Sequence, residues 1–472
     1  MPEINLLNES KALIVAPAGC GKSQLLVDNL KNHMGLKPIL ILTHTNAGVA
    51  SLKNKLIKSN IPDKKFKLYT IDGFAIRLVR LFSKRAEYTR EKLSGKNINY
   101  TEIRRALLRI LQGAHINDVL LSNYSQVFVD EYQDCSILQH QIILQLSLLL
   151  PTCVVGDPLQ AIFGFDPSDP LPNWDLDVCS KFSNIHSLKK PWRWINTDCD
   201  TLGEWLLEIR IKLLNNESID LNNAPSMVSW INLSEDSGKN QKSLMAACNT
   251  KAPNPNGSVL IIGDSKNPPS QKQFARVTPG AIAIESVEMK DLIAFSNQLN
   301  LSSDLALECI LDFAESVMTN IGKSDFMSRI AILSRKSGRK LPTAAEQAAL
   351  NFLATPTYSL AGILLSELNQ QAGVRVFRLD ILKACVRAMD GLQENNKILF
   401  QESILAIREQ SRFRGRHLPK RAVGSTLLLK GLEADVAVIL NADELNPNNL
   451  YVALSRGSRR VVVCSKSHIL NG

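Results

Sequence analysis

The stretch ALIVAPAGCGKS at residues 12–23 is an apolar run followed by a loop of small residues that ends in Lys22 and Ser23. A strand, such a loop and a helix bind phosphate, because small residues let backbone N–H groups surround the anion. Lys22 would reach the β and γ phosphates of a nucleotide, and the Ser23 hydroxyl would bind Mg²⁺. The alternative is a glycine turn before a structural helix. The candidate cofactor-binding residues are Ala16, Pro17, Ala18, Gly19, Cys20, Gly21, Lys22 and Ser23.

Two carboxylates follow a second apolar run, in the sequence VFVDE at residues 127–131. Nucleotide hydrolysis needs one acidic side chain to hold the metal and another to orient and deprotonate the attacking water. We therefore expect Asp130 to bind Mg²⁺ and Glu131 to act as the general base. A chance acidic pair at a strand end is the simpler alternative.

The order of apolar runs predicts an α/β fold with parallel sheets covered by helices. Four strands are expected at 12–16, 39–43, 127–129 and 153–155, and further strands at 258–264, 436–440 and 461–464. A helical pattern fills 301–421. The predicted layout is an N-terminal α/β domain at 1–186 with a short helical insertion at about 76–125, a second α/β domain at 187–300 and 422–472, and a helical insertion at 301–421.

The composition is that of a folded globular protein, with 45% hydrophobic and 21% charged residues among 472. A formal net charge of +10 suits a polyanionic partner such as nucleic acid, although many other roles tolerate it. No apolar run is long enough to span a bilayer, and the N-terminus lacks a secretory signal. We expect a cytoplasmic protein with no membrane association.

Nine cysteines are scattered along the chain without a CxxC pair. This distribution argues against a disulfide framework and against a structural zinc site. Cys20 in the phosphate loop has two interpretations: a redox switch, because a helix N-terminus lowers a thiol pKa, or a small residue that fills the loop. We favour the second.

The motifs resemble, in order, those of the UvrD/Rep/PcrA branch of superfamily 1 DNA helicases. Asp130–Asp134 resembles the DExQD box of that family. The other similar blocks are Leu42–Asn46 (TFTN), Thr70–Leu78 (TFHGLAxRL), Val155–Phe165 (VGDxxQSIYGF), Pro191–Arg193 (NYR), Lys430–Glu433 (KGLE) and Tyr451–Arg456 (YVALTR). A narrower resemblance, in Asp72–Phe74, is to the helicase component of Gabija-type anti-phage defence systems.

The resemblance implies two RecA-like domains that hold Mg·ATP. It assigns Gln160 to sensing the γ-phosphate, and Arg193 and Arg456 to two arginine fingers from the second domain. Trp192 would stack on adenine, and Glu433 would lie near the ribose. The implied catalytic residues are Lys22, Glu131, Gln160, Arg193 and Arg456. The family also has an upstream glutamine that reads adenine, and the residues before the loop contain none, which leaves base specificity open.

The family also implies a track for single-stranded DNA. Thr43, Asn46 and Thr70 would contact phosphate or sugar, while Phe163 and Phe165 would stack on bases, which every sequence permits. Two apolar rings beside a strand are alternatively core residues.

The sequence thus predicts an ATP-dependent single-stranded-DNA translocase with helicase capability, of 3′→5′ polarity by resemblance, acting on single-stranded or tailed DNA. The first alternative is a DNA-activated ATPase that does not unwind and that serves a partner nuclease in anti-phage defence. The second is a non-catalytic nucleic-acid-binding module. RNA is a further alternative substrate.

Overall fold

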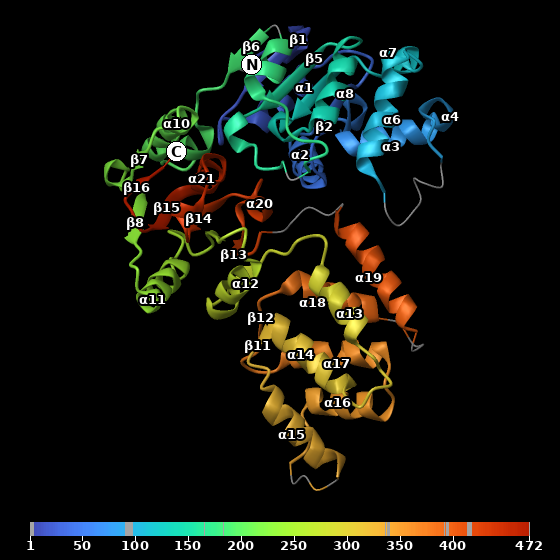
Figure 1. Ribbon diagram of the computed structural model, residues 1–472, viewed down its shortest axis with the longest axis vertical. Helices are drawn as coiled ribbons and strands as arrows, with labels where there is room; N and C mark the ends of the chain where they lie inside the picture. The colour runs from blue at the N-terminus through green and yellow to red at the C-terminus, as the bar shows by residue number, and fades with distance from the viewer. Residues whose placement is uncertain are drawn as a thin grey trace. The chain divides into compact units, whose positions relative to one another are not determined.

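The computed structural model describes residues 4–89, 98–164, 166–182, 184–335, 337, 340–390, 392, 396–412 and 418–471. Two six-stranded sheets with surrounding helices form the protein, which confirms the predicted α/β class (Figure 1). The chain divides into two compact units. The first comprises Met1–Trp230, Ala442–Val461 and Ser467–Gly472, and the second comprises Ile231–Asn441 and Val462–Lys466.

The first sheet has the strand order β3-β2-β4-β5-β1-β6, and all its neighbouring strands are parallel. Its strands are β1 (Lys11–Val15), β2 (Ile39–Thr43), β3 (Phe66–Thr70), β4 (Gln126–Asp130), β5 (Thr152–Gly156) and β6 (Asn184–Ser187). The strand predicted at 39–43 has the observed bounds, and the other three lie within a residue or two of theirs. Parallel order brings the carboxyl ends of these strands, with the loops that follow them, to one edge.

Both faces of the first sheet are buried, as its apolar strands require. Alternate residues of each strand point to opposite faces, so Leu13 and Ile14 belong to different cores. Helices α1 (Lys22–Asn32) and α2 (Asn46–Lys58) contribute to one core. The other core contains residues of α3 (Ile71–Leu81), α6 (Tyr100–Gln112), α7 (Asn117–Asn123) and α8 (Ile137–Ser147), and α4 (Ser83–Ala86) follows α3.

Three further helices belong to the first unit: α9 (Trp192–Ile195), α10 (Asp200–Leu214) and α21 (Pro447–Leu454). A short antiparallel pair, β7 (Ile219–Asp220) and β16 (Ile469–Leu470), accompanies them. The sequence prediction placed these segments in a second domain. The observed grouping differs because Trp194, Tyr451 and Arg193 bind the loop after β1, as described below.

The second sheet has the strand order β10-β13-β9-β14-β15-β8. Its strands are β8 (Val228–Asn232), β9 (Val259–Ile262), β10 (Ile282–Ala283), β13 (Arg421–Gly424), β14 (Ala434–Ile439) and β15 (Gly457–Ser465), accompanied by α11 (Ser237–Cys248), α12 (Pro268–Val277) and α20 (Thr426–Leu429). The boundary between the units runs through β8 and β15. Within the described part of the chain, no helix has the length and hydrophobicity needed to cross a membrane.

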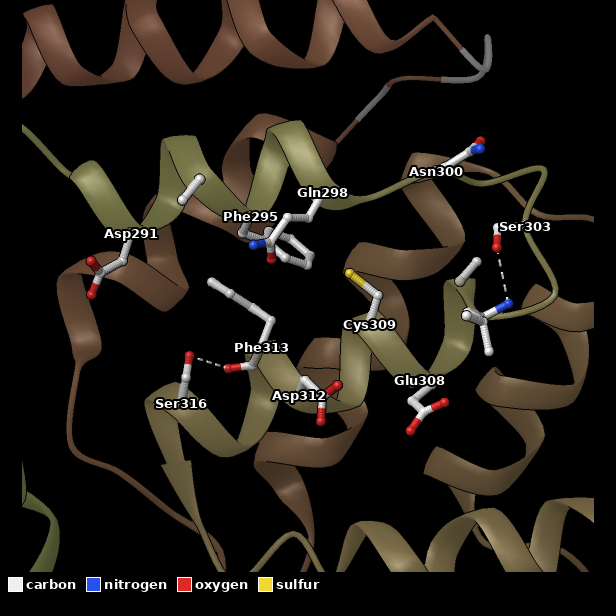
Figure 2. A pocket seen from close by; sticks show the side chains of 13 residues that line it. Asp291, Phe295, Gln298, Asn300, Ser303, Glu308, Cys309, Asp312, Phe313 and Ser316 are labelled. Carbon is white, nitrogen blue, oxygen red and sulfur yellow. Dashed lines mark hydrogen bonds between the residues drawn. The ribbon is translucent and has the colours of Figure 1, made fainter.

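A helical part of the second unit begins at Lys290, before the predicted start at 301, because α13 shares the helical core. Its helices are α13 (Lys290–Gln298), α14 (Ala306–Val317), α15 (Lys323–Ser334), α16 (Ala344–Ala354), α17 (Tyr358–Gln370), α18 (Leu379–Met389) and α19 (Lys397–Arg412), with the antiparallel pair β11 (Met318–Thr319) and β12 (Arg375–Val376). A cavity of about 580 Å³ lies between α13 and α14, where Phe295 stacks on Phe313 (Figure 2). None of the predicted site residues lines it.

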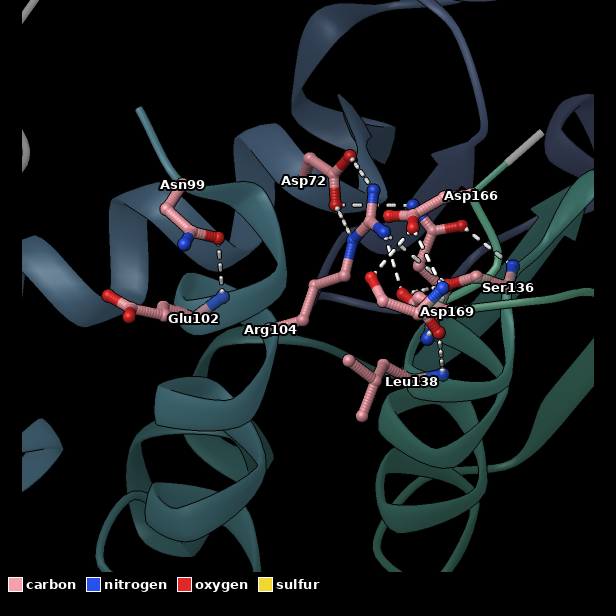
Figure 3. A network of polar contacts seen from close by, with 10 residues as sticks. Asp72, Asn99, Glu102, Arg104, Ser136, Leu138, Asp166 and Asp169 are labelled. Carbon is pink, nitrogen blue, oxygen red and sulfur yellow. Dashed lines mark hydrogen bonds and ion pairs between the residues drawn. The ribbon is translucent and has the colours of Figure 1, made fainter. Parts of the chain in front are cut away.

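A partly buried ionic network ties the helical insertion of the first unit to the sheet edge (Figure 3). Arg104 of α6 donates two hydrogen bonds to Asp72 at the start of α3, at 2.7 and 2.6 Å, and one to Asp169 at 2.8 Å. Asp169 also accepts from the Ser136 hydroxyl and the Leu138 backbone at the start of α8. One arginine therefore fixes the beginnings of two helices and the loop that follows β5.

Replacing Arg104 with alanine leaves Asp72 and Asp169 as uncompensated charges, so we expect the variant to lose about 3–5 kcal/mol of stability. Denaturant unfolding measures this loss. Arg105→Ala, which removes an exposed arginine from the same helix, is the matched control and should stay within about 0.5 kcal/mol of wild type. An Arg104→Ala protein as stable as the control would show that the network contributes little.

Candidate functional site

The loop between β1 and α1 has the backbone that a phosphate site requires. Gly19 and Gly21 have φ angles of 72° and 87°, in the left-handed region that favours glycine. Gly21 is the N-cap of α1, so the helix begins with Lys22 and Ser23. The free N–H groups of this first helical turn and the positive end of the helix dipole lie at the loop, which suits an anion.

Two aromatic residues that the sequence analysis did not single out hold this loop. A Cβ atom on Gly19 would lie 2.4 Å from the ring of Trp194, so only glycine fits there. The Arg193 backbone N–H donates to the Gly19 carbonyl at 3.1 Å. The hydroxyl of buried Tyr451 accepts from the Ala18 N–H at 3.1 Å. Their only sequence signal is that Trp194 and Tyr451 stand next to or within the predicted PWR and YVALSR blocks.

The charged groups predicted for catalysis meet beside the loop. The Lys22 ammonium lies 3.8 Å from the Glu131 carboxylate, and among the described residues it has no hydrogen-bond partner although it is buried. Burial and the neighbouring Glu131 carboxylate raise the pKa of Asp130 to about 7. A buried cation without a hydrogen-bond partner fits a nucleotide phosphate, and an acidic pair at β4 fits a divalent cation. Lys22, Ser23 and Asp130 therefore suit Mg·ATP.

The backbone and side chain of Glu131 are both constrained. Its φ of 55° is rare for a residue with a side chain, and such strain tends to collect at functional sites. Gln133 donates to the Glu131 carboxylate at 2.5 Å and accepts from the Asp157 N–H at 3.1 Å. Gln133 thus links the end of β4 to the turn after β5. Gln133 stands within the block that resembles the DExQD box, but no role was predicted for it from the sequence.

The turn after β5 carries Gln160, whose amide donates to buried Asp157 at 2.8 Å. Asp157 also accepts two hydrogen bonds from Arg210 of α10, at 3.0 and 2.8 Å. Arg210 could not be predicted from the sequence, because one arginine on a helix is usually an exposed residue.

Both predicted arginine fingers lie in the first unit, near α21 and the loop. Arg193 donates to the Ser455 carbonyl at 2.6 Å. Arg456 is 4% exposed and donates to the Val452 carbonyl and the Ser455 hydroxyl.

The two residues predicted to contact the nucleoside are placed in different units. Trp192 is 40% exposed and lies close to Gly21, and the Lys190 ammonium sits 3.8 Å from its ring centroid. Glu433 is exposed and belongs to the second unit, between α20 and β14.

The residues predicted to contact DNA continue the same sheet edge. Thr43 ends β2 and is in register with Thr70 at the end of β3 on one side and with Asp130 at the end of β4 on the other. Thr43 is 1% exposed, and its hydroxyl has no hydrogen-bond partner in the described part of the chain. The Thr70 hydroxyl caps α3 by accepting from the Gly73 N–H, and half-buried Asn46 begins α2.

Phe163 is half-buried, and its ring centroid lies 5.0 Å from that of His44, the residue after Thr43. His44 was quoted only as part of the TFTN-like block. Phe163 therefore stands beside the edge that carries Thr43. Phe165 lies outside the described residues.

Comparison with known sequences agrees with this geometry. The profile of the UvrD/REP helicase N-terminal domain matches residues 3–94 and 83–171 in two overlapping segments. Residues 3–171 are thus similar to the N-terminal domain of UvrD/REP helicases. The UvrD/REP segment includes the phosphate loop, the acidic pair, Gln160 and the threonines of the edge.

The curated relatives are much longer proteins. An ATP-dependent helicase/nuclease component from Oenococcus oeni is 32% identical over 96 residues, which cover 20% of this chain and 8% of the relative. The protein of the same name in Lacticaseibacillus casei is 39% identical over 90 residues, covering 17% and 7%. The RecB component of the RecBCD enzyme of Buchnera aphidicola is 27% identical over 153 residues, covering 32% and 12%.

Two solved helicases are also similar. Pif1 helicase from Candida albicans matches with a TM-score of 0.42 and 10% identity, over 98% of this chain and 93% of its own. The arterivirus nonstructural protein 10 helicase, solved with DNA, has a TM-score of 0.29 and 13% identity, over 56% of this chain and 50% of its own. The likeness to UvrD/REP helicases rests on the sequence match alone.

Cys20 supports the second of its two interpretations, because it is buried and burial raises the pKa of its thiol to about 12. At pH 8 only about one molecule in 10⁴ would carry the reactive thiolate. We expect iodoacetamide to modify half-buried Cys309 at least about tenfold faster than Cys20, as followed by peptide mass spectrometry. Equal modification rates for the two thiols would favour the interpretation of Cys20 as a redox switch instead.

Proposed function

We propose that this chain is an ATP-dependent single-stranded-DNA translocase with helicase activity and 3′→5′ polarity. The observation that carries the proposal is the buried Lys22 ammonium, which faces the Asp130–Glu131 pair at the end of a phosphate loop. Thr43 lies next to Asp130 on the neighbouring strand, and Thr70 lies next to Thr43 on the strand beyond. A nucleotide site and an edge that binds single-stranded DNA would then belong to the same sheet.

In the proposed reaction, the loop N–H groups and Lys22 bind the phosphates of ATP. Ser23 and Asp130 would hold Mg²⁺, which supplies positive charge to the phosphate oxygens. Glu131, oriented by Gln133, accepts the proton of the attacking water. Trp192 offers its exposed indole to the base. Glu433 remains a candidate for the ribose.

The two arginines would stabilise charge that develops on the γ-phosphate. Arg193 is joined through its backbone to Gly19 and through its side chain to Ser455, so it moves with both the loop and α21. Gln160 would report the γ-phosphate to Asp157. These contacts support the proposed roles of Arg193 as an arginine finger and of Gln160 as a γ-phosphate sensor.

On the DNA side, Thr43, Asn46 and Thr70 would contact the sugar–phosphate backbone, and Phe163 with Phe165 would stack on bases. Such contacts tolerate any sequence, which a translocase needs. The formal charge of +10 favours a polyanionic substrate.

A DNA-activated ATPase within a nuclease complex is the second candidate. Two relatives are named as components of an ATP-dependent helicase/nuclease, and a third is a component of the RecBCD enzyme. The matched segments cover only 7 to 12% of the relatives' lengths. A role in anti-phage defence would be one setting for such a complex.

The decisive experiment measures ATP hydrolysis by the purified chain with and without single-stranded DNA, followed by unwinding of 3′-tailed and 5′-tailed duplexes. The proposal expects stimulated hydrolysis and unwinding of the 3′-tailed duplex. Stimulation without unwinding would favour the nuclease-associated ATPase. DNA binding without any hydrolysis would favour a binding module, and stimulation by RNA alone would change the substrate.

Lys22→Ala and Glu131→Gln should both abolish turnover, but through different steps. Loss of Lys22 removes a charge that binds the phosphates, so ATP affinity should fall by about tenfold or more. Glu131→Gln keeps the shape without the base, so ATP should still bind. Titration with a fluorescent ATP analogue separates the two. Glu102→Gln, on an exposed carboxylate of α6, is the control; hydrolysis by Glu131→Gln at the control rate would refute the base assignment.

Phe163→Ala should weaken single-stranded-DNA affinity roughly 5–150-fold, because base–aromatic stacking contributes ~1–3 kcal/mol. Fluorescence anisotropy with an oligothymidine measures the affinity. Phe82→Ala is the control. It removes a half-buried phenylalanine at the C-terminal end of α3, the end opposite Thr70, and should leave DNA affinity unchanged. A lower unfolding midpoint with unaltered affinity would make Phe163 a packing residue instead.

A further inference from the structure

The turn formed by residues 157–163 connects the two halves of the proposed site. Gln160, the proposed γ-phosphate sensor, lies in its middle, and Phe163, the proposed base-stacking residue, lies at its end. From the side of α10, Arg210 holds Asp157 at the start of the turn. Whatever sets the position of this turn would therefore act on nucleotide and DNA together.

Asn448, near the start of α21, holds the same turn from a different helix. Its side-chain amide donates to the Pro158 carbonyl at 3.1 Å and to the Ala161 carbonyl at 2.9 Å. These two carbonyls flank Gln160. One amide group with two N–H donors is suited to this task, because the acceptors are both backbone oxygens that cannot donate in return.

The same helix contacts the phosphate loop. Tyr451, one turn after Asn448, accepts from the Ala18 N–H, and the Ser455 carbonyl at the end of α21 accepts from Arg193. Residues three and seven positions apart lie on one side of a helix. α21 therefore presents Asn448 to the turn, Tyr451 to the loop and Ser455 to an arginine finger, over a length of about 10 Å.

We infer that Asn448 is a positioning residue that couples the phosphate loop to the turn carrying Phe163. A shift of the loop on binding ATP would move Tyr451 and α21, and Asn448 would pass that shift to the Pro158 and Ala161 carbonyls. The inference rests on the proposed function, since it concerns communication between an ATP site and a DNA site. In this proposal Asn448 acts through the Pro158 and Ala161 carbonyls and not by binding either ligand.

The test is the ratio of ATP hydrolysis rates with saturating and without single-stranded DNA. Asn448→Asp keeps the size of the side chain but replaces its two donors with a carboxylate that the two carbonyls repel. We expect the ratio to fall about fivefold or more, within the range of coupling between sites. Asn449→Asp is the matched control, because it adds the same charge at the next position of the helix, where the wild-type amide donates to Asn446. Its ratio should equal that of wild type.

Loss of packing alone would lower both rates or the unfolding midpoint without changing the ratio. If Asn448→Asp does not fold, Asn448→Ala removes the donors without adding charge and must show the same loss. A wild-type ratio above one that both Asn448 variants retain would overturn the inference while leaving the proposed function intact. A wild-type ratio of one would overturn the proposed function, and the inference with it.

Discussion

The contact between Trp194 and Gly19 is the constraint on which the rest of the first unit depends. The indole occupies the space where any side chain at Gly19 would stand, and its N–H donates to the Gly457 carbonyl at 2.9 Å. A buried tryptophan removes a large apolar area from water, so this contact holds segments distant in sequence against the phosphate loop. It explains why Arg193 and Arg456 share a compact unit with Lys22.

The second constraint is the parallel register of the first sheet. Because β2, β3 and β4 run in the same direction and pair in register, Thr43, Thr70 and Asp130 end side by side. Strands buried on both faces cannot slip without exposing apolar side chains, so this alignment is fixed by the core. The register therefore places the residues proposed to bind the nucleotide and the DNA at neighbouring positions of one sheet edge.

Much of this could be predicted from local sequence. The apolar runs located the strands, and the small residues before Lys22 pointed to a loop whose backbone suits a phosphate, because both signals are short-range. The partners that came from other elements were missed: Trp194 and Tyr451 on the loop, Arg210 on Asp157, and Arg104 on Asp72 and Asp169. The local sequence around an arginine or aromatic residue in a helix is the same whether the side chain faces solvent or a partner distant in sequence. Only the fold determines which of the two it contacts. The division into units differed from the predicted domains for the same reason.

One edge of the first sheet is proposed to bind both ATP and single-stranded DNA, and the binding of each is proposed to change the affinity for the other. The most direct measurement is the affinity of the chain for oligothymidine with and without a saturating non-hydrolysable ATP analogue and Mg²⁺. We expect the analogue to change the DNA dissociation constant by about fivefold or more, and DNA to change the affinity for the analogue by the same factor. Two DNA dissociation constants that agree within experimental error would refute this coupling.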